Sequence, residues 1–213
     1  MKYKDKNESY YTNLRKDMLP FLGKGDRILE IGCGNGILLK YLKDSNLYNE
    51  VWGSEMNYTN NLVGIDKFLF GKIEDSMSDI PNNYFDTLVF NDVLEHLFDP
   101  YETILKIKDK LKDNGVIVAS IPNIRHISIL YMLIFKKDFK YQLGGIMDFT
   151  HVRFFTKKSI IRLFEENGFD IMTIEGISEN PFFIKRFLTK IISFVFGSDI
   201  RNAQFAIKAK KRL

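Results

Sequence analysis

The sequence Ile28-Leu29-Glu30-Ile31-Gly32-Cys33-Gly34-Asn35-Gly36 joins a short apolar run to a turn with three closely spaced glycines. An apolar run of this length that stops at glycine is typical of a buried strand. Glycine has no Cβ, so the backbone can turn sharply and also lie close to a ligand. Apolar residues at helical spacing follow in residues 37–42. The stretch therefore predicts a strand, a tight ligand-binding turn and a helix in direct succession.

Strand and helix patterns alternate along the rest of the chain. Apolar patterning predicts strands at 27–31, 50–55, 68–70, 85–90, 116–121, 169–174 and 204–209, and helices at 37–42, 100–111 and 156–167. The pair Asn114-Gly115 is expected to end the second helix, because glycine tolerates the left-handed conformation of a helix stop. This alternation indicates a single α/β domain over residues 1–213 with a mostly parallel sheet. Residues 124–155 break the pattern and are expected to form an inserted acceptor-site or lid segment beside the ligand crevice.

Charge and cysteine content restrict the classes of protein. The 213 residues carry a formal net charge of +4, and their Lys and Arg residues are scattered, which argues against a nucleic-acid partner. Cys33 is the one cysteine, so no internal disulfide can form and a reducing compartment is expected. The N-terminus lacks the apolar core of a signal peptide, and no run reaches the about 18 apolar residues of a spanning helix. We therefore expect a cytoplasmic protein, and its oligomeric state stays open.

The charges around the glycine turn indicate which cofactor it binds. A dinucleotide brings a pyrophosphate to such a turn, and the carboxylate of Glu30 would repel it. S-adenosylmethionine instead carries an ammonium and a sulfonium, both of which a carboxylate favours. Glu55 ends the second expected strand, 19 positions after Gly36. That is close to the about 20-residue spacing at which an acidic residue reaches ribose hydroxyls in such folds.

Several motifs together resemble class I S-adenosylmethionine-dependent methyltransferases. Residues 30–36 resemble their first motif, Glu55 their ribose-binding acid, residues 91–97 their motif after the fourth strand, and residues 111–115 the turn into their fifth strand. The resemblance implies an α/β, Rossmann-like three-layer sandwich with a seven-stranded, mostly parallel sheet whose last strand is antiparallel. It also implies that Gly32, Gly34 and Gly36 shape the cofactor turn, and that S-adenosylhomocysteine is the product.

Further cofactor contacts follow from this resemblance. Many relatives have an Asp after the glycine of the fourth motif, but here Lys72 follows Gly71. The Ile73 backbone and Glu74 are therefore expected to line the adenine pocket, and Asn91 and Asp92 to lie near the methionine end. Glu30 is expected to attract the ammonium group. Tyr10, Tyr11 and Arg15 are expected on a helix before the first strand, which either folds over the cofactor or lies on the surface.

Methyl transfer to a hydroxyl needs an aligned acceptor and a group that removes a proton. Histidine suits this role, because its unperturbed pKa is about 6.5. His151 is the first candidate base and His126 the second, ahead of His96, and Asp148 is expected to face the crevice beside His151. No metal is expected, because Asp92 and Asn123 offer too few oxygen ligands for a hard cation.

The acceptor is expected from a second resemblance. Residues 148–156, with Ile121-Pro122-Asn123, resemble a methyltransferase subgroup found with glycosyltransferases in bacterial surface-polysaccharide synthesis. A sugar hydroxyl of a glycan or nucleotide-sugar is therefore the first expected acceptor. The alternatives are a quinone-like or other hydrophobic molecule, favoured if residues 127–135 line the crevice, and a non-enzymatic cofactor-binding scaffold. Residues 181–196 are expected either to pack on the sheet or to contact the inner membrane surface as a basic amphipathic helix.

Overall fold

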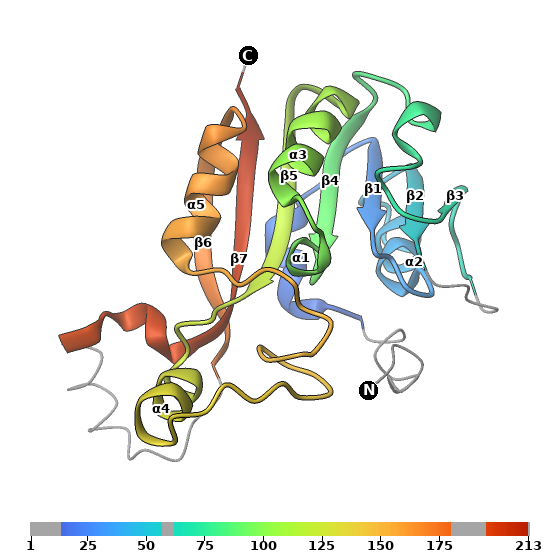
Figure 1. Ribbon diagram of the computed structural model, residues 1–213. Helices are drawn as coiled ribbons and strands as arrows, with labels where there is room; N and C mark the ends of the chain where they lie inside the picture. Colours follow the sequence, from blue (N-terminus) through green and yellow to red (C-terminus); the bar gives the residue numbers. More distant parts are fainter. Residues whose placement is uncertain (1–13, 57–61, 180–194, 213) are drawn as a thin grey trace.

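The computed structural model describes residues 14–56, 62–179 and 195–212, and its centre is a seven-stranded sheet (Figure 1). The strand order is β3-β2-β1-β4-β5-β7-β6. The strands are β1 (Arg27–Ile31), β2 (Glu50–Glu55), β3 (Lys67–Phe70), β4 (Phe85–Asn91), β5 (Leu111–Pro122), β6 (Phe169–Glu179) and β7 (Asn202–Lys211). The pairs among β1 to β5 are parallel, whereas β7 is antiparallel to both β5 and β6. The predicted fold class, including the antiparallel last strand, is confirmed.

Helices cover both faces of the sheet, and short turns connect the rest. The α-helices are α1 (Leu19–Leu22), α2 (Ile37–Asp44), α3 (Pro100–Ile107), α4 (Ile127–Phe135) and α5 (Lys157–Glu166). The 3-10 turns are η3 (Lys16–Met18), η4 (Met77–Asp79), η5 (Leu94–His96), η6 (Lys108–Lys110) and η7 (Ser198–Arg201). Among the described residues, no helix combines the length and the apolar character that a membrane crossing requires.

Successive residues of the central strands pack into different hydrophobic clusters. Leu29 and Phe90 belong to a cluster with side chains of α3 and α5, whereas their neighbours Ile28 and Val89 belong to one with side chains of α1 and α2. Because side chains alternate across a strand, this division means that each face of the sheet is buried. The molecule is thus a three-layer sandwich, with β1 and β4 at its centre.

The strands in the C-terminal half of the chain are longer than the sequence pattern predicts. β5 begins at Leu111, and Asn114, with φ of 66°, lies inside its span together with Gly115. The expectation that this pair ends a helix is therefore wrong, since α3 already ends at Ile107. Leu111 pairs with Phe85 of β4, and the register shifts before the next pair. The cause is backbone pairing with a distant strand, which local propensity does not contain.

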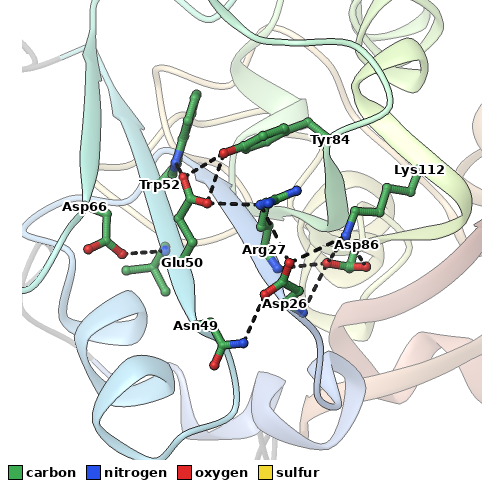
Figure 2. Close-up of polar contacts among 10 residues, drawn as sticks. Asp26, Arg27, Asn49, Glu50, Trp52, Asp66, Tyr84, Asp86 and Lys112 are labelled. Carbon is green, nitrogen blue, oxygen red and sulfur yellow. Dashed lines mark hydrogen bonds and ion pairs between the residues drawn. The ribbon is translucent and has the colours of Figure 1, made fainter.

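Charged side chains connect the amino ends of the parallel strands (Figure 2). Arg27 at the start of β1 donates to Glu50 at the start of β2 at 3.0 Å. Asp86 of β4 accepts from the backbone amide of Arg27 at 2.8 Å and from Lys112 at 3.0 Å. The glycine turn follows the opposite, carboxyl end of β1. The network therefore links the strands at their amino ends. Ligands of open α/β sheets bind at the opposite, carboxyl edge.

Residues 124–155 leave the sheet at the end of β5 and return beside their starting point. Asn123 forms an isolated bridge with Phe155, and the Ile124 amide donates to the Phe155 carbonyl at 2.9 Å. α4 begins just after this junction, with the side chain of His126 as its N-cap. The remaining residues run back as an irregular loop (Figure 1). The junction fixes the segment at the carboxyl edge of the sheet.

Candidate active site

The turn after β1 has the shape that its glycines predict. Gly32 and Gly36 have φ of 72° and 78°, in the left-handed region that other residues avoid. A Cβ on Gly32 would lie 2.5 Å from Cγ2 of Val93, and one on Gly36 would lie 2.6 Å from Cδ1 of Ile65. Gly36 also begins α2 as its N-cap. Both positions thus need glycine for conformation and for space.

A cavity of about 1230 Å³ opens at the carboxyl ends of β1, β2 and β4. Ligand pockets for drug-sized molecules usually measure about 300–1,000 Å³, so this one has room for a cofactor and a second molecule. Eight of the nine expected cofactor-binding residues line it: Glu30, Gly32, Gly34, Glu55, Ile73, Glu74, Asn91 and Asp92. The ninth, Gly36, is the N-cap of α2 next to Ile65 and is not among the described lining residues.

Glu30 lines the cavity and is almost fully buried. Its Oε1 accepts from Nδ2 of Asn91 at 2.9 Å, whereas its Oε2 has no hydrogen-bond partner among the described residues. Burial raises the pKa of Glu30 to about 7, with the carboxylate of Glu55 adding to the rise, while Asn91 and Arg15 oppose it. A buried carboxylate with an unsatisfied oxygen at a cavity wall is suited to a cationic ligand group.

Glu55 ends β2 and faces the turn. Its Oε2 accepts from the Gly34 amide at 3.1 Å, so the carboxylate lies directly against the glycines. β3 pairs beside it, and Gly71, Ile73 and Glu74 continue the cavity wall from that strand's end. This is the arrangement in which an acidic residue reaches ribose hydroxyls and the next loop borders a base.

Asp92 is held by three elements that are distant in the sequence. Arg15, which precedes η3, forms an ion pair with it. Nε2 of Gln204 in β7 and Oγ of Ser120 in β5 both donate to its Oδ1, at 2.8 and 3.1 Å. Burial alone would lower the pKa of Arg15, but the carboxylates of Asp92 and Asp17 raise it, so this arginine stays charged. Sequence reasoning missed Gln204 and Ser120, since polar residues inside strands carry no such signal. Tyr10 and Tyr11 lie outside the described residues.

The three expected catalytic residues occupy different surroundings. Asp148 lines the cavity and accepts from the backbone amide and the hydroxyl of Thr150, at 2.9 and 2.7 Å. His151 is buried, and its Nε2 lies 3.8 Å from Oε1 of Glu95. His126 contacts Ser128 at 2.7 Å, and burial lowers its pKa. Within the described chain neither His151 nor His126 borders the cavity, whereas His96 does.

Three apolar side chains also line the cavity: Leu97, Phe98 and Leu143. Leu97 and Phe98 follow η5, and Leu143 comes from the inserted segment. Phe98 is 79% exposed and Leu143 is 57% exposed, so neither is taken up by the core. Of the described lining residues, none belongs to 127–135, which instead forms the separate helix α4. Residues 181–194 of the expected amphipathic helix lie outside the described residues.

Comparison with known proteins agrees with this geometry. Residues 3–174 match the family described as "Methyltransferase domain". The chain is 26% identical to a ubiquinone biosynthesis O-methyltransferase of Nitrosospira multiformis over 195 residues, covering 83% of this chain and 73% of the relative. It is 25% identical to the mitochondrial ubiquinone biosynthesis O-methyltransferase of Schizosaccharomyces pombe, covering 81% of this chain and 64% of the relative.

Solved structures show the same fold. An S-adenosylmethionine-dependent methyltransferase of Archaeoglobus fulgidus superposes with a TM-score of 0.65 at 21% identity, covering 98% of this chain and 96% of the other. A Burkholderia thailandensis 1,6-didemethyltoxoflavin-N1-methyltransferase, solved with S-adenosylhomocysteine, superposes with a TM-score of 0.62 at 13% identity, covering 97% and 80%. At these identities the likeness establishes the fold of the chain.

Proposed function

The chain belongs to the class I S-adenosylmethionine-dependent methyltransferase family, and we propose that its acceptor is the hydroxyl of a small, hydrophobic, quinone-like molecule. The observation that carries this proposal is the apolar lining that Leu97, Phe98 and Leu143 contribute to the cavity. An apolar acceptor ring placed there removes exposed hydrophobic surface from water, which stabilises binding.

The residues present suit the cofactor. Gly32 and Gly34 of the turn line the cavity, and Glu30 offers a buried carboxylate oxygen to an ammonium group. Glu55 would hold the ribose hydroxyls, and Ile73 with Glu74 would border the adenine. When bound, the cofactor supplies a methyl group activated by its sulfonium.

The chain itself must then position the acceptor and take up its proton. Among the titratable groups expected to do so, Asp148 borders the cavity, as does His96. A direct contact with the acceptor therefore falls to these two side chains, and His151 and His126 would act only through other groups. The apolar lining excludes water from the acceptor and so limits competing reactions.

Two acceptor classes remain to be distinguished. Relatives named for ubiquinone biosynthesis support a quinone-like acceptor, and so does the apolar lining. A sugar hydroxyl, the first acceptor expected from the sequence, stays a prediction. Sugars present many hydroxyl groups that need polar partners; Asp148 and His96 can serve some of them, whereas the three apolar side chains offer none.

We expect micromolar binding of S-adenosylmethionine and S-adenosylhomocysteine by calorimetry, with no binding of NADH. Methyl transfer should then occur to a catechol that carries an alkyl chain and not to nucleotide-sugars.

Leu143→Ala should raise KM for that catechol about tenfold without changing cofactor affinity, because it removes apolar contact surface. Leu105→Ala is the matched control, since this α3 residue is 56% exposed and away from the cavity. Transfer to nucleotide-sugars alone would contradict the quinone-like acceptor.

We also propose that α4 contacts an anionic lipid surface, from which a hydrophobic acceptor would come. Leu133, Ile134 and Phe135 are exposed at its C-terminal end, and lysines follow at 136 and 137. Arg125, just before α4, donates to the carbonyl of Phe196, which adds a further exposed apolar side chain at this junction. Apolar side chains beside lysines complement acyl chains beside anionic headgroups.

Sedimentation with liposomes tests this contact. The chain should bind vesicles that contain phosphatidylglycerol at low salt, and Phe135→Ser should weaken this binding at least about fivefold through lost apolar burial. Leu105→Ser is the control for an exposed apolar residue on another helix. Absence of binding to anionic vesicles, or equal binding by both variants, would end the proposal.

A further inference from the structure

Two histidines and a glutamate meet at the wall of the cavity. Glu95 and His96 belong to η5, and His151 comes from the inserted segment. One ligand atom from each side chain lies within 4.8 Å of the other two. The two imidazole rings contact each other edge to face, with centroids 4.7 Å apart. The insertion thus brings a third potential metal ligand to a pair that the sequence already places side by side.

Hydrogen bonds to backbone carbonyls fix the tautomer of both rings. Nδ1 of His96 lies 3.1 Å from the carbonyl of Thr150, and Nδ1 of His151 lies 3.0 Å from the carbonyl of Ile146. A carbonyl only accepts, so each Nδ1 carries a proton, and in the neutral form of each ring the lone pair lies on Nε2. Metal-ligating histidines are almost always oriented in this way, through the second ring nitrogen.

The backbone also holds the three groups in place. The amides of Val152 and Arg153 donate to the carbonyl of Glu95 at 2.9 and 3.0 Å, which joins the inserted segment to η5. The side chain of Glu95 is 1% exposed and that of His151 is 6% exposed. Moving a carboxylate into a protein interior is costly, and a cation bound by Glu95 would offset part of that cost.

We propose that Glu95, His96 and His151 bind one divalent first-row transition-metal ion, such as Zn²⁺. Two imidazole nitrogens and one carboxylate oxygen suit such ions and disfavour Mg²⁺ and Ca²⁺, which prefer oxygen ligands. Ligands about 2.1 Å from Zn²⁺ lie roughly 3.4 Å apart in tetrahedral geometry. The 3.8 Å between Nε2 of His151 and Oε1 of Glu95 is slightly longer, and the three ligand atoms lie within 4.8 Å of one another, so the side chains must move closer together around the ion to complete the site.

The ion would lie where an acceptor can reach it. Three protein ligands leave a coordination position open, and His96 borders the cavity. An acceptor hydroxyl oxygen bound at that position would be oriented and made more acidic. This role rests on the proposed function, whereas the binding of the ion does not. Asp92 and Asn123, the side chains from which no metal site was expected, are not part of this cluster: Asp92 pairs with Arg15, and the Asn123 side chain donates to backbone carbonyls.

Titration with Co²⁺ tests the site without cofactor or acceptor. The full chain, stripped with EDTA, should bind one equivalent of Co²⁺ with visible d–d absorption, and Zn²⁺ should displace it. His96→Ala and Glu95→Gln should weaken Co²⁺ binding at least about tenfold, since each removes a ligand. His126→Ala is the control, because it removes a histidine outside the cluster. Circular dichroism of each variant confirms folding, and His96 is the least buried ligand.

The outcomes separate this proposal from the proposed function. Absence of d–d absorption in the wild-type chain, or equal Co²⁺ affinity in the wild type and His96→Ala, would overturn the metal site. In either case, cofactor binding measured by calorimetry stands as an independent result. If the wild-type chain binds Co²⁺ but not S-adenosylmethionine, the methyltransferase activity is contradicted and the metal site is still supported.

Discussion

Replacing Gly32 by alanine is expected to lower the free energy of unfolding by about 2–6 kcal/mol and to weaken S-adenosylhomocysteine binding about a hundredfold. The φ of 72° at this position costs about 1–3 kcal/mol for a residue with a Cβ. The added Cβ would also lie 2.5 Å from Cγ2 of Val93, and overpacking of this kind costs about 1–3 kcal/mol. If the backbone relaxes to a more favourable φ, or shifts to relieve the overlap with Val93, the turn against which the cofactor would lie moves.

A second substitution separates the two causes. Val93→Ala removes the Cγ2 atom that meets the new Cβ, so Gly32→Ala with Val93→Ala should recover the part of the stability lost to overlap. The part that belongs to the backbone conformation should remain lost. Urea denaturation and calorimetry of the two single variants and the double variant give both numbers. Wild-type stability and affinity in Gly32→Ala would refute the assignment of this turn.

Glu30→Gln is expected to stabilise the unliganded chain at pH 8 by about 3 kcal/mol, because the glutamine carries no buried charge. Burial raises the pKa of Glu30 from 4.5 to about 7. Between these values the folded chain holds more protons at this site than the unfolded chain. The free energy of unfolding that Glu30 contributes is therefore fully present below pH 4.5 and is lost as the pH rises through 7.

The same variant should bind the cofactor about tenfold more weakly at pH 7, since the ammonium group loses its carboxylate. Stability and affinity thus move in opposite directions, which distinguishes a ligand-binding charge from a structural one. Urea denaturation of wild type and variant from pH 4.5 to 8 isolates the contribution of Glu30, because the other groups are shared. A stability difference that does not change with pH would show that Glu30 titrates normally.

The amino-acid sequence by itself determined the fold class, the cofactor turn and most of the residues around that turn. These features are local: β1, the glycines and α2 are consecutive, and their chemistry follows from side-chain pattern and the absence of Cβ atoms. Glu55 was predictable because the βαβ unit fixes its distance along the chain. Strand bounds such as that of β5 were less predictable, because pairing with β4 extends them.

Only the tertiary structure decided which polar groups meet. Arg15, Asp92 and Gln204 come from the two ends and the middle of the chain. Glu95 of η5 contacts His151 of the inserted segment, 56 positions later in the sequence. Such contacts depend on where the strands pair and where the insertion returns to the sheet, and no local pattern contains that information. The residues of the candidate metal site were each visible in the sequence, but the folded chain is what brings their ligand atoms together.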